Sequence, residues 1–187
     1  MRKLKFVIVP VLFLAALVLI GASCGEEDRK RSRDKDEEEE EEKYLTYENE
    51  KWDFEIEYPE DWEKEEDDSS LNEFTVAFIS PPEDEDDEVR ENFLVYVSIP
   101  PPGDFDELVA DIIEGLSKDA NVLDYEKLMI SGYSGYKASY VHDEIQYLHY
   151  FIDAGDAWYQ VLYVALESTY SKYIDQVETM IDSFEIK

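Results

Sequence analysis

The sequence is poor in the residue types on which most catalytic and metal sites depend. It has a single cysteine, Cys24, and only two histidines, His142 and His149. One cysteine cannot form an internal disulfide, and no CxxC, HExxH or Gly-rich phosphate loop occurs. In the segment Gly132–Tyr136, tyrosine stands where the Gly-x-Ser-x-Gly nucleophile motif needs its last glycine, so we expect a turn there. The sequence therefore predicts no catalytic residue, no metal ligand and no cofactor.

Basic residues are also scarce. Residues 44–187 carry 8 Lys and Arg against 37 Asp and Glu, which gives −29 of the total net charge of −31. Such a surface repels a phosphate backbone, so nucleic acid is not an expected partner. It also repels anionic lipid headgroups, so contact with a membrane would require something other than surface charge.

The acidic residues leave one alternative function open. They are densest at residues 63–68 and 83–88, which we expect to be solvated loops. Calcium prefers carboxylate oxygens, but the 12-residue EF-hand loop and its DxDxDG signature are absent. One function that the sequence leaves open is therefore that of an acidic exported protein that binds calcium, with binding that is weak and nonspecific.

The amino terminus has the order of a secretory signal. Basic residues in 1–5 precede an uncharged apolar run, residues 6–20, and the small residues 21–23 follow. An uncleaved transmembrane helix is the alternative, but residues 6–23 fall short of the roughly 20 apolar residues that a span needs. We therefore expect residues 1–23 to be a signal peptide.

The position of Cys24 indicates the type of signal. Ile-Gly-Ala-Ser-Cys, residues 20–24, resembles the lipobox of prokaryotic lipoproteins, with glycine in place of the usual leucine. That resemblance implies a diacylglycerol on the Cys24 thiol and cleavage before it, whereas an ordinary signal or an incidental thiol is the alternative. We expect an exported protein, anchored through lipid on Cys24 to the outer face of the cell membrane or on its periplasmic side.

Residues 24–43 form a charged stretch that ends in six glutamates and a lysine. The stretch has no aromatic or large aliphatic residue, so it cannot bury enough apolar surface to offset its ordering entropy. We expect a solvated spacer that extends by self-repulsion, and a docking tail for basic partners is the alternative.

Residues 44–187 are predicted to form one folded domain. The chain is 44% hydrophobic and 14% aromatic, which is too much apolar surface for a disordered protein. Alternating or continuous apolar patterns predict strands at 52–58, 72–80, 91–99, 123–131, 135–142, 145–153 and 157–166. The helical period appears over 105–116, with Asp104 and Glu107 placed as a capping box, and again from about Ser168 to Phe184.

Short connections between the predicted strands imply antiparallel neighbours. If Asp143 and Glu144 form a hairpin tip, then His149 lies opposite Ala138 and not beside His142, which disfavours a shared metal site. We expect His149 to be a packed or half-exposed sheet residue. The predicted fold class is α+β, an antiparallel sheet flanked by helices.

Four segments carry a resemblance to a known family. They are FEIEYPEDW (54–62), VSIPPP (97–102), ISGYSGYKASY (130–140) and MIDSFEI (180–186). Together they are similar to the PsbP-like superfamily, which includes an extrinsic subunit of photosystem II, exported prokaryotic proteins and lipoproteins, and a nuclear import factor that binds Ran. The resemblance implies an α/β/α sandwich around an antiparallel sheet and no shared catalytic residue. We therefore expect a non-enzymatic binding or assembly domain, held at the membrane through Cys24, with a protein partner that the sequence does not identify.

Overall fold

The computed structural model describes residues 43–66, 74–83, 89–100 and 103–187. The predicted signal peptide, Cys24 and nearly all of the predicted spacer lie outside these residues. So do residues 67–68 and 84–88 of the two acidic clusters. None of the helices within the described ranges is both long enough and apolar enough to span a membrane.

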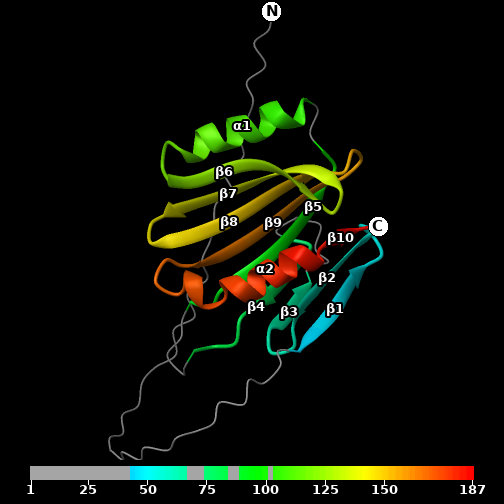
Figure 1. Cartoon of the computed structure of the whole chain (residues 1–187), viewed down its shortest axis with the longest axis vertical. Helices are drawn as coiled ribbons and strands as arrows, with labels where there is room; N and C mark the ends of the chain where they lie inside the picture. Colours follow the sequence, from blue (N-terminus) through cyan, green and yellow to red (C-terminus); the bar gives the residue numbers. More distant parts are fainter. Residues whose placement is uncertain (1–42, 67–73, 84–88, 101–102) are drawn as a thin grey trace, which may run out of the picture. The chain divides into compact units, whose positions relative to one another are not determined.

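A seven-stranded sheet is the largest element of the described chain, and every pair of neighbours in it is antiparallel (Figure 1). Its strands in spatial order are β3 (Glu63–Glu66), β4 (Val76–Ile79), β5 (Asn92–Ser98), β9 (Trp158–Leu166), β8 (Ile145–Asp153), β7 (Tyr133–His142) and β6 (Asn121–Ile130). The long strands β6 to β9 form a meander, and β5 joins its far side by pairing with β9. β6 and β3 are the two edges of the sheet.

A small second sheet brings the two ends of the domain together. It has the order β1-β2-β10, with strands β1 (Tyr44–Asn49), β2 (Phe54–Pro59) and β10 (Glu185–Ile186). The remaining elements are α1 (Phe105–Leu116), the short 3₁₀ helix η1 (Tyr170–Lys172) and α2 (Ile174–Ser183). Because β10 pairs with β2, the end of the chain is fastened next to the first strands.

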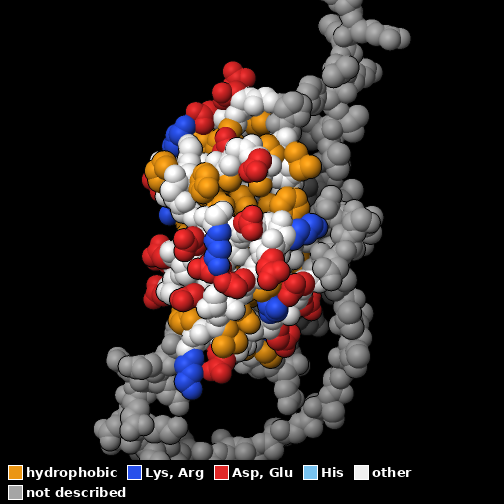
Figure 2. Space-filling model, turned by 90° about the vertical axis from the view of Figure 1, so that its right-hand side faces the viewer, with side chains coloured by type: hydrophobic (Ala, Val, Ile, Leu, Met, Phe, Trp, Pro, Cys, Tyr) orange, Lys and Arg blue, Asp and Glu red, His pale blue; other side chains and the backbone are white. Residues whose placement is uncertain are grey.

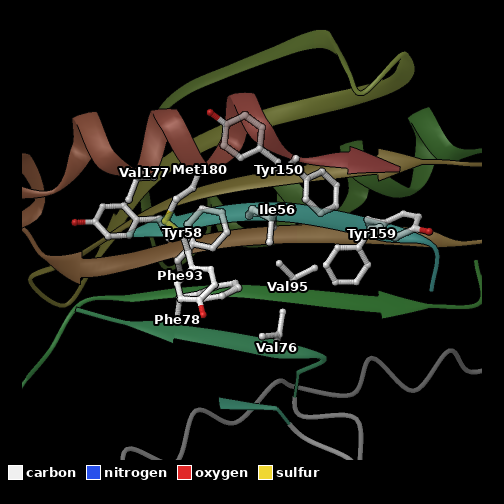
Figure 3. Close-up of a cluster of buried hydrophobic side chains, with 14 of the residues drawn as sticks. Ile56, Tyr58, Val76, Phe78, Phe93, Val95, Tyr150, Tyr159, Val177 and Met180 are labelled. Atoms are coloured by element: carbon white, nitrogen blue, oxygen red, sulfur yellow. The ribbon is translucent and has the colours of Figure 1, made fainter. Parts of the chain in front are cut away.

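One hydrophobic cluster fills the space between the large sheet, the small sheet and α2 (Figure 3). β2 contributes Ile56 and Tyr58, β5 contributes Phe93 and Val95, and α2 contributes Met180. Each is 9% exposed or less. Full burial of such a side chain is worth roughly 1.5–3 kcal/mol, so this cluster is the main source of cohesion between the two sheets.

The opposite face of the large sheet packs against α1. Val109 is fully buried there, and the Phe105 ring lies 5.8 Å from the rings of both Tyr136 and Trp158. The helix has the predicted bounds, and the Asp104 carboxylate accepts a hydrogen bond from the Glu107 amide at 3.1 Å. The predicted class, an antiparallel sheet with helices on both faces, is confirmed.

The hairpin turns set the register of the meander. Asp143 and Glu144 both have positive φ, 50° and 69°, which is the mark of a type I′ turn. His142 pairs with Ile145 and His149 with Ala138, so the predicted register is confirmed. The turn expected at the GYSGY motif is confirmed only at its start: Ser131 and Gly132 have φ of 50° and 81° and connect β6 to β7. The rest of the motif, with Gly135, belongs to strand β7.

Several boundaries differ from the predicted ones. The second helix was expected from about Ser168, but η1 comes first and α2 begins only at Ile174. The first predicted strand begins at Phe54 rather than residue 52, because residues 50–53 form the turn between β1 and β2. The prediction of a solvated loop at Glu63–Glu66 was wrong, because these four residues pair with β4 as an edge strand. β1 and β10 were not predicted.

Candidate binding groove

The two histidines lie apart on the β7–β8 hairpin. His142 is exposed at the end of β7, with Nε2 3.7 Å from Oδ2 of Asp143. His149 is in the middle of β8, between Ala138 and Leu162 of the neighbouring strands. In the part of the chain that the structure describes, no three His, Cys, Asp or Glu residues gather in a way that could hold a metal ion.

The His149 imidazole is packed on the α1 face of the sheet. Its ring centre is 3.9 Å from that of Phe151, and neither ring nitrogen has a hydrogen-bond partner among the described residues. Burial lowers the pKa of His149 to about 3, and the Gln160 side chain opposes this only in part. The imidazole is therefore neutral in the folded domain at any pH near neutrality, as expected for a packed sheet residue.

This burial predicts a specific acid sensitivity. Because the pKa of His149 is about 3 in the folded state and about 6.5 when unfolded, the unfolded state binds the extra proton between those values. The contribution of the neutral His149 to the free energy of unfolding is fully present above pH 6.5 and is lost as the pH falls towards 3. Between pH 7 and pH 4 the wild type should lose roughly 2–4 kcal/mol more stability than His149→Leu, measured by urea unfolding at each pH. The exposed His142→Gln variant is the control and should keep the wild-type pH dependence; equal pH dependence in all three proteins would contradict the assignment.

The described members of the acidic clusters are largely paired with bases. Arg90 Nη1 lies 2.9 Å from Glu63, Lys64 Nζ lies 2.6 Å from Glu66, and Lys172 Nζ lies 2.9 Å from Glu83. The first pair joins β3 to the residues before β5, the second lies within β3, and the third joins η1 to the residues after β4. Pairs as solvent-accessible as these are worth about 1 kcal/mol or less each. They do not form a calcium site, and the predicted weak calcium binding stays a prediction.

An open groove of about 490 Å³ lies between the β6–β7 hairpin and the end of α2. Its apolar lining comes from four elements: Leu128, Met129 and Ile130 of β6, Tyr150 of β8, Ile181 of α2, and Phe184 and Ile186 at the chain end. Ser131, Lys137, Asp182, Ser183 and Glu185 supply its polar groups. Figure 3 shows Tyr150 beside α2, at the border of the hydrophobic cluster, with its hydroxyl turned away from the other labelled side chains.

Hydrogen bonds fix the two walls of this groove. The Ile186 amide donates to Ser131 Oγ at 2.7 Å, which ties β10 to the β6–β7 turn. The Glu57 amide donates to Ser183 Oγ at 2.9 Å, which ties the end of α2 to β2. The groove is therefore a built feature of the fold, because its walls are held by contacts between residues 55 and 126 positions apart in sequence.

The groove is acidic. Among the described residues that line it, Lys137 is the single base, and its Nζ lies 3.9 Å from the Glu126 carboxylate. Burial raises the pKa of Tyr150, and nearby ionisable groups raise it further: Tyr170, Glu178, Asp182 and Glu126. The carboxylates of Asp182 and Glu185 in the lining, with Glu126 beside Lys137, make the potential of the groove negative, and such a potential favours a cationic group. Figure 2 shows acidic side chains spread over one face of the molecule, with basic and hydrophobic side chains among them.

This groove was not predicted from the sequence. Of its elements β10 was not predicted, and MIDSFEI and ISGYSGYKASY were interpreted only as marks of the fold. The usable signal was the strand at 123–131, in which Asp124, Glu126 and Lys127 place charge on both faces. Charge on both faces is typical of an edge strand, and an edge strand borders a surface that other chains can reach.

The fold defines a class of protein: a small α+β domain in which an antiparallel sheet carries a helix on each face and leaves an open groove beside the second helix. Within that class the chain belongs to the PsbP-like protein family, whose family model matches residues 6–186. This confirms the family suggested by the four sequence segments. The comparison with curated proteins gives no match.

Solved structures share the fold at low sequence identity. The cyanobacterial PsbP protein of Synechocystis (CyanoP) is 17% identical, with a TM-score of 0.57, over 89% of this chain and 98% of that one. LpqN of Mycobacterium tuberculosis, described as involved in cell envelope biogenesis, is 12% identical, with a TM-score of 0.59, over 72% of this chain and 83% of that one. The Ran-binding protein Mog1p of Saccharomyces cerevisiae is 12% identical, with a TM-score of 0.53, over 78% of this chain and 96% of that one. These similarities establish the fold.

Proposed function

We propose that this chain is a lipid-anchored, extracytoplasmic PsbP-like protein whose folded domain acts as a non-enzymatic binding or assembly module. The observation that carries the binding role is the open, acidic groove between the β6–β7 hairpin and α2. It combines apolar lining with a few polar groups, which is the usual make-up of a surface that binds another molecule. A solved protein of the same fold is described as Ran-binding, and this supports the proposal of a protein-binding role.

The proposed location at the membrane is based on the sequence. Cys24 follows an apolar run and small residues, and a charged spacer separates it from the domain. A domain with 37 acidic and 8 basic residues is repelled by an anionic bilayer, so a covalent lipid would be needed to keep it there. The spacer then sets the distance between the membrane and the groove.

Site-specific photo-cross-linking of the full chain in its own cells tests the binding role. A photoreactive residue in place of Leu128, a partly buried side chain that lines the groove on the face of β6 opposite to α1, should give a discrete cross-linked adduct. The same residue at Glu114 is the control, because that position is an exposed one on α1, on the opposite face of the sheet. Absence of adducts from position 128, or identical adducts from both positions, would overturn the proposal.

A further inference from the structure

The outer edge of β6 is an unpaired strand edge. Among the strands that the structure describes, β6 pairs with β7 alone and is the last strand of the sheet. Three of its apolar side chains are exposed: Leu123 at 52%, Tyr125 at 37% and Met129 at 66%. The register shifts between Val122 and Asp124, so the regular edge runs from Asp124 to Ile130. Seven residues are enough to pair with a typical strand.

The hairpin geometry shows which backbone groups point outward. In a two-residue hairpin the residues that flank the turn form a hydrogen-bonded pair, here Ile130 and Tyr133, and bonded pairs then alternate along the ladder. The amides of Tyr125, Lys127 and Met129 therefore point away from β7. The Tyr125 amide agrees with this, because it donates to the Asp124 side chain at 2.9 Å and not to β7. Lys127 and Met129 thus offer donors and acceptors to a further strand.

The side chains of β6 differ between its two faces. On the α1 face Lys127 is neutralised by Asp106, 2.7 Å away, and Tyr125 stacks on Tyr136 with ring centres 5.2 Å apart. On the groove face Glu126 has only the longer 3.9 Å contact with Lys137. The groove carries further carboxylates at Asp182 and Glu185. A strand added to β6 would therefore meet an apolar surface on one face and a negative one on the other.

These features indicate which kind of segment can bind at the β6 edge. A second copy of this chain is disfavoured, because each domain carries a net charge of −29, from 37 acidic and 8 basic residues. A strand with Lys or Arg on alternate residues would place its cations near Glu126 and the groove, and its apolar residues near Tyr125 and Met129. We infer that the β6 edge and the adjoining groove bind an extended, cationic segment of a different polypeptide by strand addition. This inference rests on the proposed binding function and specifies the partner's chemistry.

Peptide binding to the full chain in detergent micelles tests this inference. The probe is a fluorescently labelled peptide that alternates Lys and Val over eight residues, and its binding is followed by fluorescence anisotropy. Its binding should slow hydrogen exchange at the Lys127 and Met129 amides. A peptide of the same sequence that is N-methylated at consecutive central amides keeps the charge but cannot pair as a strand, so it should not bind.

Variants separate strand pairing from charge attraction. Met129→Pro removes an outward N–H without touching the β7 ladder and should weaken binding at least about tenfold, whereas Met129→Ala should not. Glu126→Lys should weaken it about tenfold, and Glu60→Lys, an exposed charge reversal in the turn before β3, should have little effect. Equal binding of the N-methylated peptide, or a dimer that Met129→Pro dissolves, would overturn the inference. Cross-linking from position 128 together with failure of the peptide would retain the binding function and reject the cationic strand. Failure of both would reject both.

Discussion

Replacing Phe54 by alanine is expected to lower the free energy of unfolding by roughly 3–5 kcal/mol. Phe54 is 1% exposed and lies where three parts of the fold meet. Its ring centre is 5.9 Å from that of Tyr47 in β1, 6.1 Å from Tyr159 in the large sheet and 5.5 Å from Phe184 after α2. Truncation would leave a cavity that these rigid aromatic neighbours cannot fill, so the cost includes both lost burial and lost packing.

Urea unfolding, followed by tryptophan fluorescence, measures this effect. Leu45→Ala is the control in the same small sheet, because Leu45 is 42% exposed and should cost less than about 1 kcal/mol. The Phe54 ring supports Phe184, which also lines the groove. Phe54→Ala should therefore weaken partner binding at temperatures near the unfolding transition of the variant. A cost for Phe54→Ala no larger than that of Leu45→Ala would show that the small sheet does not contribute to the core as described.

Local signals explain the parts of the fold that the sequence could predict. The bounds of α1 follow from its apolar stripe and from the Asp104 cap, both of which act within one or two turns of helix. The β7–β8 register follows from the two residues of its turn, Asp143 and Glu144. In both cases every residue needed for the prediction lies within about 20 positions of the others, so no long-range packing has to be known.

Long-range pairing explains the parts that were missed. β10 is only two residues long and is a strand because Glu185 and Ile186 meet β2, which lies about 130 positions earlier. Glu63–Glu66 has the composition of a loop and becomes strand β3 because β4 supplies the ladder and Arg90 neutralises Glu63. Tertiary context overrides local propensity at such positions. The groove depends on the same contacts, since Ser131 and Ile186 form one of its walls. The charged strand at 123–131 could therefore indicate an edge that other chains reach, but not the groove beside it.

Replacing Cys24 by serine is expected to abolish lipid attachment altogether. Serine has no thiol to accept the diacylglycerol, so the lipobox-like segment at residues 20–24 would remain without a lipid. A single acyl chain gives only marginal membrane binding, whereas two chains give stable anchoring, at about 0.8 kcal/mol for each buried CH₂. Because the domain carries −29, from 37 acids and 8 bases, surface charge cannot replace that anchor.

Mass spectrometry of the amino-terminal peptide and partition into a detergent phase measure the two consequences. The wild type should begin at a diacylglycerol-modified Cys24 and enter the detergent phase, and Cys24→Ser should show no lipid mass. Ser23→Ala is the matched control, because alanine keeps a small residue directly before the cysteine and should leave lipid attachment intact. A wild-type chain with unmodified Cys24, or with an intact Met1, would refute the lipid anchor. It would leave the proposed binding role in place, because the described lining of the groove comes from the folded domain, between Leu128 and Ile186.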